Sequence, residues 1–415
     1  MVMYDLVVRG GYGPDGDRQD LAISGDRIVH IAPDINAPTV REILVPGKLI
    51  SPPFVESHIH LDSVLTAGEP RWNSSGTLFE GIAIWGERKQ TLTDEDVQER
   101  ALKALRKQAE QGVLYVRTHA DVSENNLIAF KALLDLRDRV KDWLTLQVVA
   151  FPQDGIYSNS ENQKLLETAV QLGADVVGGI PHYELTREDG VQSVRYIFEL
   201  AQQYNKLIDI HCDEIDDDQS RFLEVVAACA LRSGLKSRVT ASHTTAFGSY
   251  NNAYAFKLMG FLPGTGINII ANPLINITLQ GRTDTYPKRR GITRVKELWQ
   301  NGINVSLGHD CIQDPWYSLG TGNMLEVAHM AVHGCQMTGM AEIAACYQMI
   351  TSGGARTLNL SDDYGLEVGK PANVIILDAD SPYEAIRRRA TVEYVISRGK
   401  VLVQTTPPQV NWSNS

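Results

Sequence analysis

Cysteine and long apolar runs are both scarce in this sequence. Its 415 residues include 5 cysteines, and no two of them form a Cys-x-x-Cys pair. We therefore expect neither a disulfide framework nor a structural zinc ribbon, but the reduced thiols of a cytoplasmic protein. No apolar run reaches the ~18 residues that a membrane-spanning helix needs, and the first residues lack the basic and apolar regions of a signal peptide.

Positive charge is also in deficit. The 39 lysines and arginines are outnumbered by 50 aspartates and glutamates, which gives a net charge of −11 with neutral histidines. Neither a nucleic acid nor a membrane surface is therefore expected as a partner. The sequence also lacks a P-loop, a Gly-x-Ser-x-Gly elbow, and the His-x-Glu and Pro-Cys-x-x-Cys signature of one class of zinc deaminases.

Strand-like and helical segments alternate between two β-rich ends. Residues 4–10, 21–31, 372–378 and 392–403 read as short strands, which predicts a small β-sandwich domain formed by residues 1–49 and 362–406. Residues 50–361 alternate apolar strands with amphipathic helices, which favours an α/β fold, a (β/α)8 TIM barrel. Its strands are predicted at residues 49–58, 113–119, 144–151, 175–180, 207–211, 238–243, 266–271 and 303–309. Residues 407–415 show no periodicity and are expected to form a tail.

Polar side chains gather where several predicted barrel strands end. His58 and His60 lie two residues apart, so on a strand both rings leave the same face. The ends of the fifth, sixth and eighth strands carry further imidazoles and carboxylates, at His211, Glu214, His243 and Asp310. Because active sites of such barrels form at the carboxyl ends of the strands, we expect all of them at one rim.

Three imidazoles and one carboxylate can bind a borderline divalent ion and leave room for water. We predict one Fe2+ or Zn2+ ion, with the ligands His58, His60, His211 and Asp310. Glu214 and His243 would then lie close enough to move protons during a hydrolysis. Five further histidines are interpreted as hydrogen-bonded core residues, namely His30, His119, His182, His329 and His333.

At these residues the sequence resembles the amidohydrolase superfamily, and within it the bacterial cytosine deaminases. The matching stretches span nearly the whole chain, at residues 76–81, 150–153, 211–217, 241–245, 280–291, 308–310 and 314–317. The resemblance implies a (β/α)8 barrel, a small β-sandwich domain, and one iron or zinc ion. It also implies a homo-oligomer that hydrolyses the exocyclic amine of a free pyrimidine base, with Glu214, His243 and Asp310 as catalytic residues. Residues 176–182 contain no lysine that could bridge two metals, so a single ion is expected.

The resemblance also implies contacts with the substrate. Gln153 would bind the amide edge of the pyrimidine, and Leu78 and Trp316 would form the apolar walls of the slot, although Trp316 could equally be a core aromatic. The chain departs from the family at Cys311, because cytosine deaminases usually carry a second Asp directly after the metal Asp. A thiol is smaller and less polar than a carboxylate and would leave room for a substituent on cytosine.

We therefore hypothesise a deaminase of cytosine and of 5-substituted cytosines, which would convert 5-methylcytosine to thymine. Neutral drift at Cys311, with cytosine still preferred, is the simpler alternative. A different ring with a similar edge, such as isoguanine, is a second alternative. A catalytically silent barrel used as a scaffold is a third, although such a protein would be expected to lose metal ligands. The native metal, the preferred substrate and the oligomeric state remain open.

Overall fold

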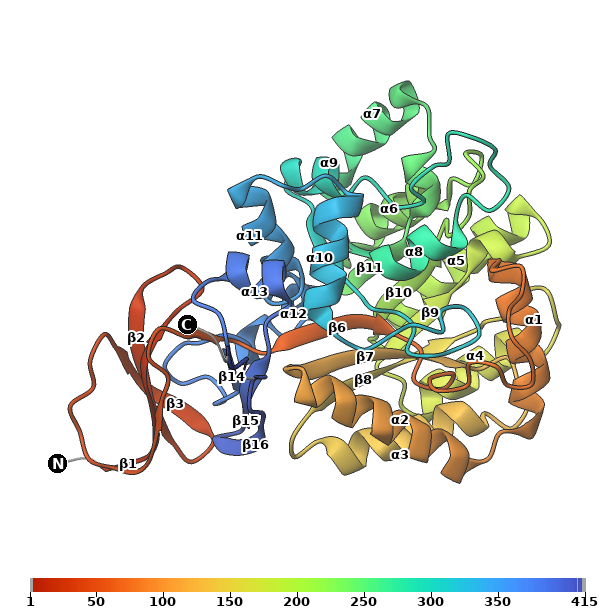
Figure 1. The fold of residues 1–415 in the computed structure, drawn as a ribbon. Helices are drawn as coiled ribbons and strands as arrows, with labels where there is room; N and C mark the ends of the chain where they lie inside the picture. The colour runs from red at the N-terminus through yellow and green to blue at the C-terminus, as the bar shows by residue number, and fades with distance from the viewer. Residues whose placement is uncertain (1–2, 409, 413–415) are drawn as a thin grey trace.

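The apolar segments at the two ends of the chain pair into one mixed β-sheet (Figure 1). The computed structural model describes residues 3–408 and 410–412. The strands of this sheet follow the order β16-β15-β14-β5-β1-β2-β3, and β4 pairs with β1. Their bounds are β1 (Tyr4–Tyr12), β2 (Arg18–Ser24), β3 (Arg27–Ala32), β4 (Thr39–Leu44), β5 (Leu49–Ser51), β14 (Val374–Leu377), β15 (Val392–Ser397) and β16 (Lys400–Gln404).

This terminal sheet curls over its own core. At the start of β3, the Ile28 amide donates to the Lys370 carbonyl at 3.0 Å, which joins β3 to the segment before β14. Apolar side chains from β1, β2, β3, β5, β14 and β15 form one buried cluster between these parts of the sheet. The small β-sandwich predicted from both ends of the chain is thereby confirmed, whereas its residue boundaries stay a prediction.

Eight parallel strands form the barrel, in the sequential order from β6 to β13. The first and last strands meet at their carboxyl ends, where the His60 amide donates to the Asp310 carbonyl at 3.1 Å and the Asp310 amide to the His58 carbonyl at 2.8 Å. The predicted (β/α)8 barrel is thus confirmed. The strand bounds are β6 (Phe54–Ile59), β7 (Val113–Asp121), β8 (Thr145–Phe151), β9 (Val176–Gly179), β10 (Leu207–Cys212), β11 (Val239–His243), β12 (Asn268–Ala271) and β13 (Asn304–Leu307).

One predicted strand is wrong. Residues 49–58 do not form a single barrel strand, because β5 belongs to the terminal sheet, where Ile50 pairs with Ile376. The barrel strand β6 begins only at Phe54, after Pro52 and Pro53. Proline has no amide hydrogen to donate to a ladder, so this pair separates the two strands and lets the chain pass from one sheet to the other.

Helices follow the barrel strands, and α2 and α3 lie side by side along the outside of β7 and β8 (Figure 1). Thr93 caps the helix that follows it, since its side chain accepts a hydrogen bond from the Asp96 amide. None of the helices within residues 3–408 is long and apolar enough to cross a membrane. The helices are α1 (Leu78–Arg88), α2 (Asp94–Glu110), α3 (Ile128–Val140), α4 (Asn162–Leu172), α5 (Arg187–Gln203), α6 (Phe222–Ser233), α7 (Asn252–Phe261), α8 (Pro273–Leu279), α9 (Val295–Gln300), α10 (Met324–Gly334), α11 (Met340–Met349), α12 (Ser352–Thr357) and α13 (Pro382–Arg388).

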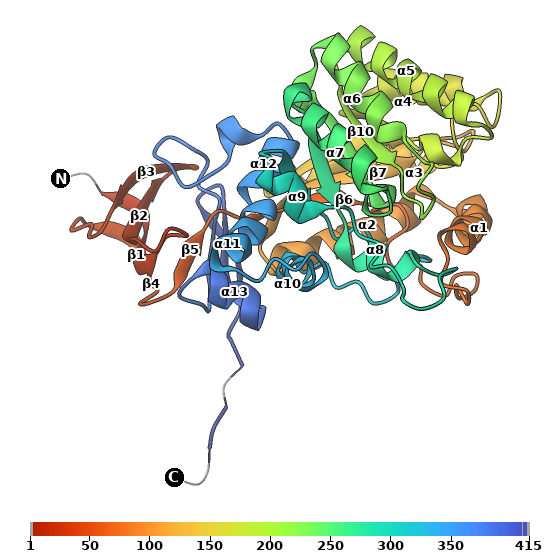
Figure 2. The ribbon, with the colours of Figure 1, turned by 90° about the horizontal axis from the view of Figure 1, so that it is seen from above.

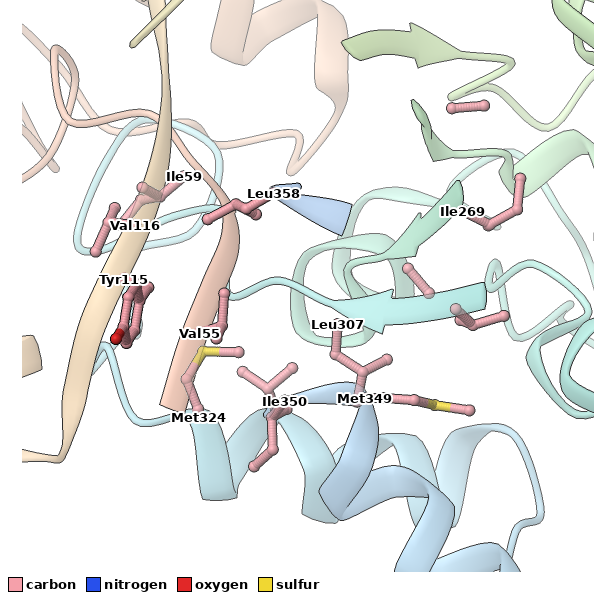
Figure 3. Close-up of a cluster of buried hydrophobic side chains, with 14 of the residues drawn as sticks. Val55, Ile59, Tyr115, Val116, Ile269, Leu307, Met324, Met349, Ile350 and Leu358 are labelled. Atoms are coloured by element: carbon pink, nitrogen blue, oxygen red, sulfur yellow. The ribbon is translucent and has the colours of Figure 1, made fainter. Parts of the chain in front are cut away.

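The seam between the first and last barrel strands is held by a buried apolar cluster. Figure 3 shows Val55 of β6 and Leu307 of β13 facing Met324, Met349 and Ile350 from the helical layer. Helix α12 packs directly on β6 at Gly354. A Cβ atom added at this glycine would come within 2.7 Å of the Val55 side chain. Tight packing of this seam fixes the position of β6, which carries the histidine pair.

The chain leaves the terminal sheet after β16. Residues 405–408 and 410–412 have no regular secondary structure, and Val410 and Trp412 are largely exposed. Figure 2 shows this segment running away from the rest of the molecule. The remaining residues of the predicted tail, 409 and 413–415, lie outside the described residues.

Candidate active site

The side chains predicted as metal ligands converge at the carboxyl ends of three barrel elements. His58 lies on β6 with His60 directly after it, His211 lies on β10, and Asp310 follows β13. The Nε2 atoms of His60 and His211 are 3.0 Å apart. Asp310 Oδ1 lies 3.6 Å from His60 Nε2 and 3.8 Å from His58 Nε2. Residues as distant in sequence as 58 and 310 therefore share one small volume.

Burial keeps the imidazoles of these histidines neutral, which is the protonation state in which histidine can bind a metal ion. His58 is fully buried and His60 is only 8% exposed. Burial, with a smaller effect of the neighbouring His119 ring, holds the pKa values of His58, His60 and His211 well below the ordinary value of histidine. Their imidazoles are therefore neutral and carry free lone pairs.

Two buried nitrogens at the centre of this cluster are unsatisfied. His58 Nε2 and His211 Nδ1 find no hydrogen-bond partner among the described residues. A buried polar atom without a partner costs about 1–3 kcal/mol, so native structures seldom keep one unless a ligand satisfies it. A set of neutral nitrogens and one carboxylate fits a borderline divalent cation.

Glu214 and His243 adjoin this cluster, as predicted from the sequence. Glu214 Oε1 lies 3.1 Å from His243 Nδ1, and His243 Nε2 lies 3.7 Å from Asp310 Oδ2. Burial first, and the nearby Asp310 second, raise the pKa of Glu214 well above its ordinary value. A carboxyl group in this setting binds a proton readily and can pass it on.

Two asparagines hold these groups in place and were missed by the sequence analysis. Asn276 Nδ2 lies 3.0 Å from His243 Nδ1, and Asn272 Nδ2 donates to Asp310 Oδ2 at 3.2 Å. Asn272 directly follows β12. The same strand-end rule that selected the other residues would therefore have found it.

Backbone strain accompanies two of the site residues. His243 has a φ of 67° and Asp310 a φ of 72°, both in the left-handed region that non-glycine residues rarely adopt. Such a conformation costs on the order of 1–3 kcal/mol and persists where the surroundings enforce it, often in functional sites. Here the two residues lie at the carboxyl end of β11 and just after β13, next to the other predicted site residues.

A cavity of about 350 Å³ opens beside the cluster. The residues predicted to bind substrate, Gln153, Leu78, Cys311 and Trp316, all line it, together with His60, Ile180, His211, Glu214, His243, Ile275, Leu279 and Asp310. The three aliphatic residues Ile180, Ile275 and Leu279 were not anticipated, because an apolar side chain in a pocket has the same sequence signal as one in a core. The lining suits a small ring that contacts apolar walls and a few polar groups.

Trp316 belongs to the cavity wall and is not an ordinary core aromatic. Its Nε1 donates to the Leu78 carbonyl at 3.2 Å, which ties the loop after β13 to the start of α1. A Cβ atom added at Gly81 would come within 2.3 Å of the Trp316 ring. The glycine therefore allows the indole to lie directly on the helix.

Cys311 lies in an apolar environment. It is 2% exposed and packs in a cluster with Ile275 and Leu279, against Leu78 and Trp316. Its Sγ donates to Asp310 Oδ1 at 3.6 Å. Burial, followed by the charge of Asp310, raises the pKa of this thiol well above its ordinary value. The thiol itself is therefore uncharged, although the carboxyl groups of Asp310 and Asp314 lie beside it.

Treating the remaining histidines as hydrogen-bonded core residues was wrong. Both ring nitrogens of His119 are buried without a partner in the described chain, and its ring centroid lies 4.0 Å from that of His58. His182 likewise has two buried, unpartnered nitrogens. The others are not core residues, since His30 and His333 are exposed and His329 is half-buried. His119 lies on β7 near its carboxyl end, so the strand-end rule could have found it.

Comparisons with known proteins agree with this geometry. The model of the amidohydrolase family matches residues 46–403. The crystal structure of 5-methylcytosine deaminase from Klebsiella pneumoniae liganded with phosphonocytosine superimposes with a TM-score of 0.95 at 48% identity, over 98% of this chain and 100% of that chain. The 5-fluorocytosine complex of the same enzyme gives a TM-score of 0.94 at 48% identity, over 99% of both chains. N-isopropylammelide isopropyl amidohydrolase from Pseudomonas sp. (strain ADP) is 30% identical, over 97% of this chain and 98% of the relative.

Proposed function

Because the chain belongs to the amidohydrolase family, we propose that it is a metal-dependent deaminase of free cytosine bases. It hydrolyses the exocyclic C–N bond of cytosine and of 5-methylcytosine, and it releases ammonia together with uracil or thymine. One observation carries this proposal: a cavity of about 350 Å³ joins a buried set of His and Asp ligands to Glu214 and Gln153. The resemblance to a deaminase of 5-methylcytosine at 48% identity supports it.

One divalent ion, Fe2+ or Zn2+, is held by His58, His60, His211 and Asp310. The 3.0 Å approach of His60 Nε2 to His211 Nε2 is compatible with this assignment, since two imidazole nitrogens bound to one tetrahedral ion lie similarly close to each other. When bound, such an ion acts as a Lewis acid and lowers the pKa of a coordinated water towards ~7. Strand β9 carries no lysine that could bridge a second ion.

Three side chains move protons and orient the reactants. Glu214 protonates ring N3 of the pyrimidine, which makes C4 more electrophilic. His243 and Asp310 hold the attacking water against C4, and Asp310 delivers a proton to the exocyclic nitrogen so that it leaves as ammonia. The contacts of His243 Nδ1 with Glu214 at 3.1 Å and of His243 Nε2 with Asp310 at 3.7 Å support this division of roles.

The substrate ring lies between Leu78 and Trp316 and presents its amide edge to Gln153. A substituent at C5 faces Cys311 in its apolar surroundings. Burying a methyl group there contributes roughly 0.8 kcal/mol, whereas a carboxylate at the same place would lose hydration against it. Acceptance of 5-methylcytosine follows from this difference.

We infer that the enzyme works in the cytoplasm as a homo-oligomer on free bases, without a nucleic-acid or membrane partner. The net charge of −11 supports the absence of a polyanionic partner. Native mass spectrometry of the purified protein tests the oligomeric state, and a monomer at micromolar concentration would contradict it.

The proposal is tested by steady-state kinetics on cytosine, 5-methylcytosine and isoguanine, with metal content measured on the same sample. We expect ammonia release from both cytosines and about one equivalent of iron or zinc. A preference for isoguanine would replace the proposed substrate while keeping the chemistry. A metal-free protein that releases no ammonia even after iron or zinc is added would instead indicate a scaffold.

A further inference from the structure

A chain of buried polar contacts runs from His58 into the interior of the barrel. His58 Nδ1 lies 3.1 Å from Ser242 Oγ, and Ser242 Oγ donates to Asp209 Oδ1 at 2.5 Å. Arg117 donates to the other oxygen, Asp209 Oδ2, at 3.0 Å. All of these side chains are fully buried.

The position of this chain follows from strand periodicity. Asp209 precedes His211 by two residues on β10, and Arg117 precedes His119 by two residues on β7, so each pair points to the same face of its strand. Ser242 pairs in register with His211. Asp209 and Arg117 therefore lie one step deeper in the barrel than His211 and His119, and Ser242 lies at the level of His211.

The direction of each hydrogen bond determines the protonation of His58. Arg117 is always charged and can only donate, so Asp209 accepts from it as a carboxylate. Ser242 gives its single hydroxyl proton to Asp209. Its oxygen can then only accept from His58, which requires the proton of the imidazole to be on Nδ1. Nε2 is left with a free lone pair on the side of Asp310 Oδ1, 3.8 Å away.

We infer that Ser242 and Asp209, anchored by Arg117, are positioning residues that lock His58 as the Nδ1–H tautomer and aim its Nε2 at the metal. The inference rests on the proposed function, because it takes His58 as a ligand. Partners of this kind orient a metal-binding histidine and raise its basicity, and their loss typically weakens metal binding 10–100-fold. No role was assigned to these three residues from the sequence.

The first test measures Zn2+ affinity by competition with a chelator, using the full-length protein. Ser242→Ala removes the acceptor of His58 Nδ1 and should weaken Zn2+ binding about 10–100-fold. Ser306→Ala is the matched control, because Ser306 is a fully buried serine on β13 whose hydroxyl contacts Thr357 and no site residue. The Ser306→Ala variant should bind Zn2+ within about twofold of the wild-type affinity, because it removes no group that orients a proposed ligand. Equal affinities of the Ser242→Ala variant and wild type would overturn the inference.

The second test measures wild-type protein and uses a variant only to assign the signal. In metal-free wild-type protein labelled with 15N-histidine, the His58 resonances, assigned by their loss in His58→Gln, should show a protonated Nδ1 and an unprotonated Nε2. A proton on Nε2 would overturn the inference even if the enzyme deaminates cytosine. Failure of wild type to bind Zn2+ or Fe2+ would instead overturn the proposed function, and this inference with it.

Discussion

At Cys311 a thiol occupies the place where related cytosine deaminases usually carry a carboxylate. The side chain is buried among aliphatic and aromatic neighbours, and its thiol stays protonated because burial raises its pKa. A single residue therefore changes the charge and the room on one wall of the cavity. On the proposed function, substrate preference at C5 depends on this residue rather than on the barrel.

Cys311→Asp should reverse the preference for a methyl group. A carboxylate placed against the methyl group loses hydration at a cost of about 1–3 kcal/mol, so the ratio of kcat/KM for 5-methylcytosine to that for cytosine should fall roughly 10-fold or more. Steady-state kinetics on both bases measures the ratio. Cys229→Ser on α6, outside the cavity, is the control and should leave it unchanged. If Cys311→Asp also leaves the ratio as in wild type, drift at this position is the better account.

Glu214→Gln should separate metal binding from proton transfer. The amide retains the size of the side chain but cannot protonate ring N3, so kcat should fall about 100-fold or more while metal content stays at the wild-type level. Glu224→Gln, a glutamate on α6 that accepts from Tyr254 outside the cavity, serves as the control. A near-normal kcat in the Glu214→Gln enzyme is incompatible with the role proposed for Glu214.

At the scale of single elements, helix α1 forms one wall of the cavity through its contact with the loop after β13. The contact depends on Gly81, because any Cβ atom there would overlap the Trp316 ring. Glycine in a helix costs roughly 0.5–1 kcal/mol relative to alanine, so this glycine lowers helix stability in exchange for the close approach of the indole.

Gly81→Ala should therefore displace Trp316 and raise KM for cytosine several-fold, with metal content unchanged. Overpacking of this kind typically lowers the free energy of unfolding by about 1–3 kcal/mol. Gly86→Ala lies on the same helix, and an added Cβ there meets no atom within 4 Å. It should keep the wild-type KM. An unchanged KM in Gly81→Ala, measured beside this control, would show that the Trp316 contact does not shape the cavity.

At the scale of the whole molecule, the proposed ligand set ties the first barrel strand to the fifth and to the segment after the last. A cation that binds only the folded state adds to its free energy of unfolding, by about 2.7 kcal/mol at a concentration 100 times the dissociation constant. A metal ion bound between the first and last strands would therefore stabilise the closed barrel.

Adding Zn2+ to metal-free protein should raise its Tm, and His211→Ala should lose most of that rise. His333→Ala is the control, since His333 is exposed on α10 and lies outside the cluster. Differential scanning calorimetry at matched Zn2+ concentrations provides the comparison. Equal Zn2+-dependent rises in wild type and His211→Ala would place the stabilising ion elsewhere.

The barrel and its rim of histidines could be predicted because both depend on local pattern. Alternating apolar runs reveal strands, and polar residues at their ends are brought to one rim by the parallel arrangement itself. The error at residues 49–58 has the same origin. An apolar run does not indicate which of two sheets its strand joins. Only the proline pair indicated that β5 and β6 are separate strands.

The sequence alone was sufficient to predict the barrel, the terminal sandwich and the polar side chains at the barrel rim, since each follows from periodicity or from a recognisable stretch. The contact of His119 with His58, the aliphatic walls of the cavity and the hydrogen-bonded support of His58 emerged only from the folded molecule. These features depend on which side chains from different strands meet at one depth of the barrel, and that depth is set by strand register and tilt, which short-range sequence patterns do not encode.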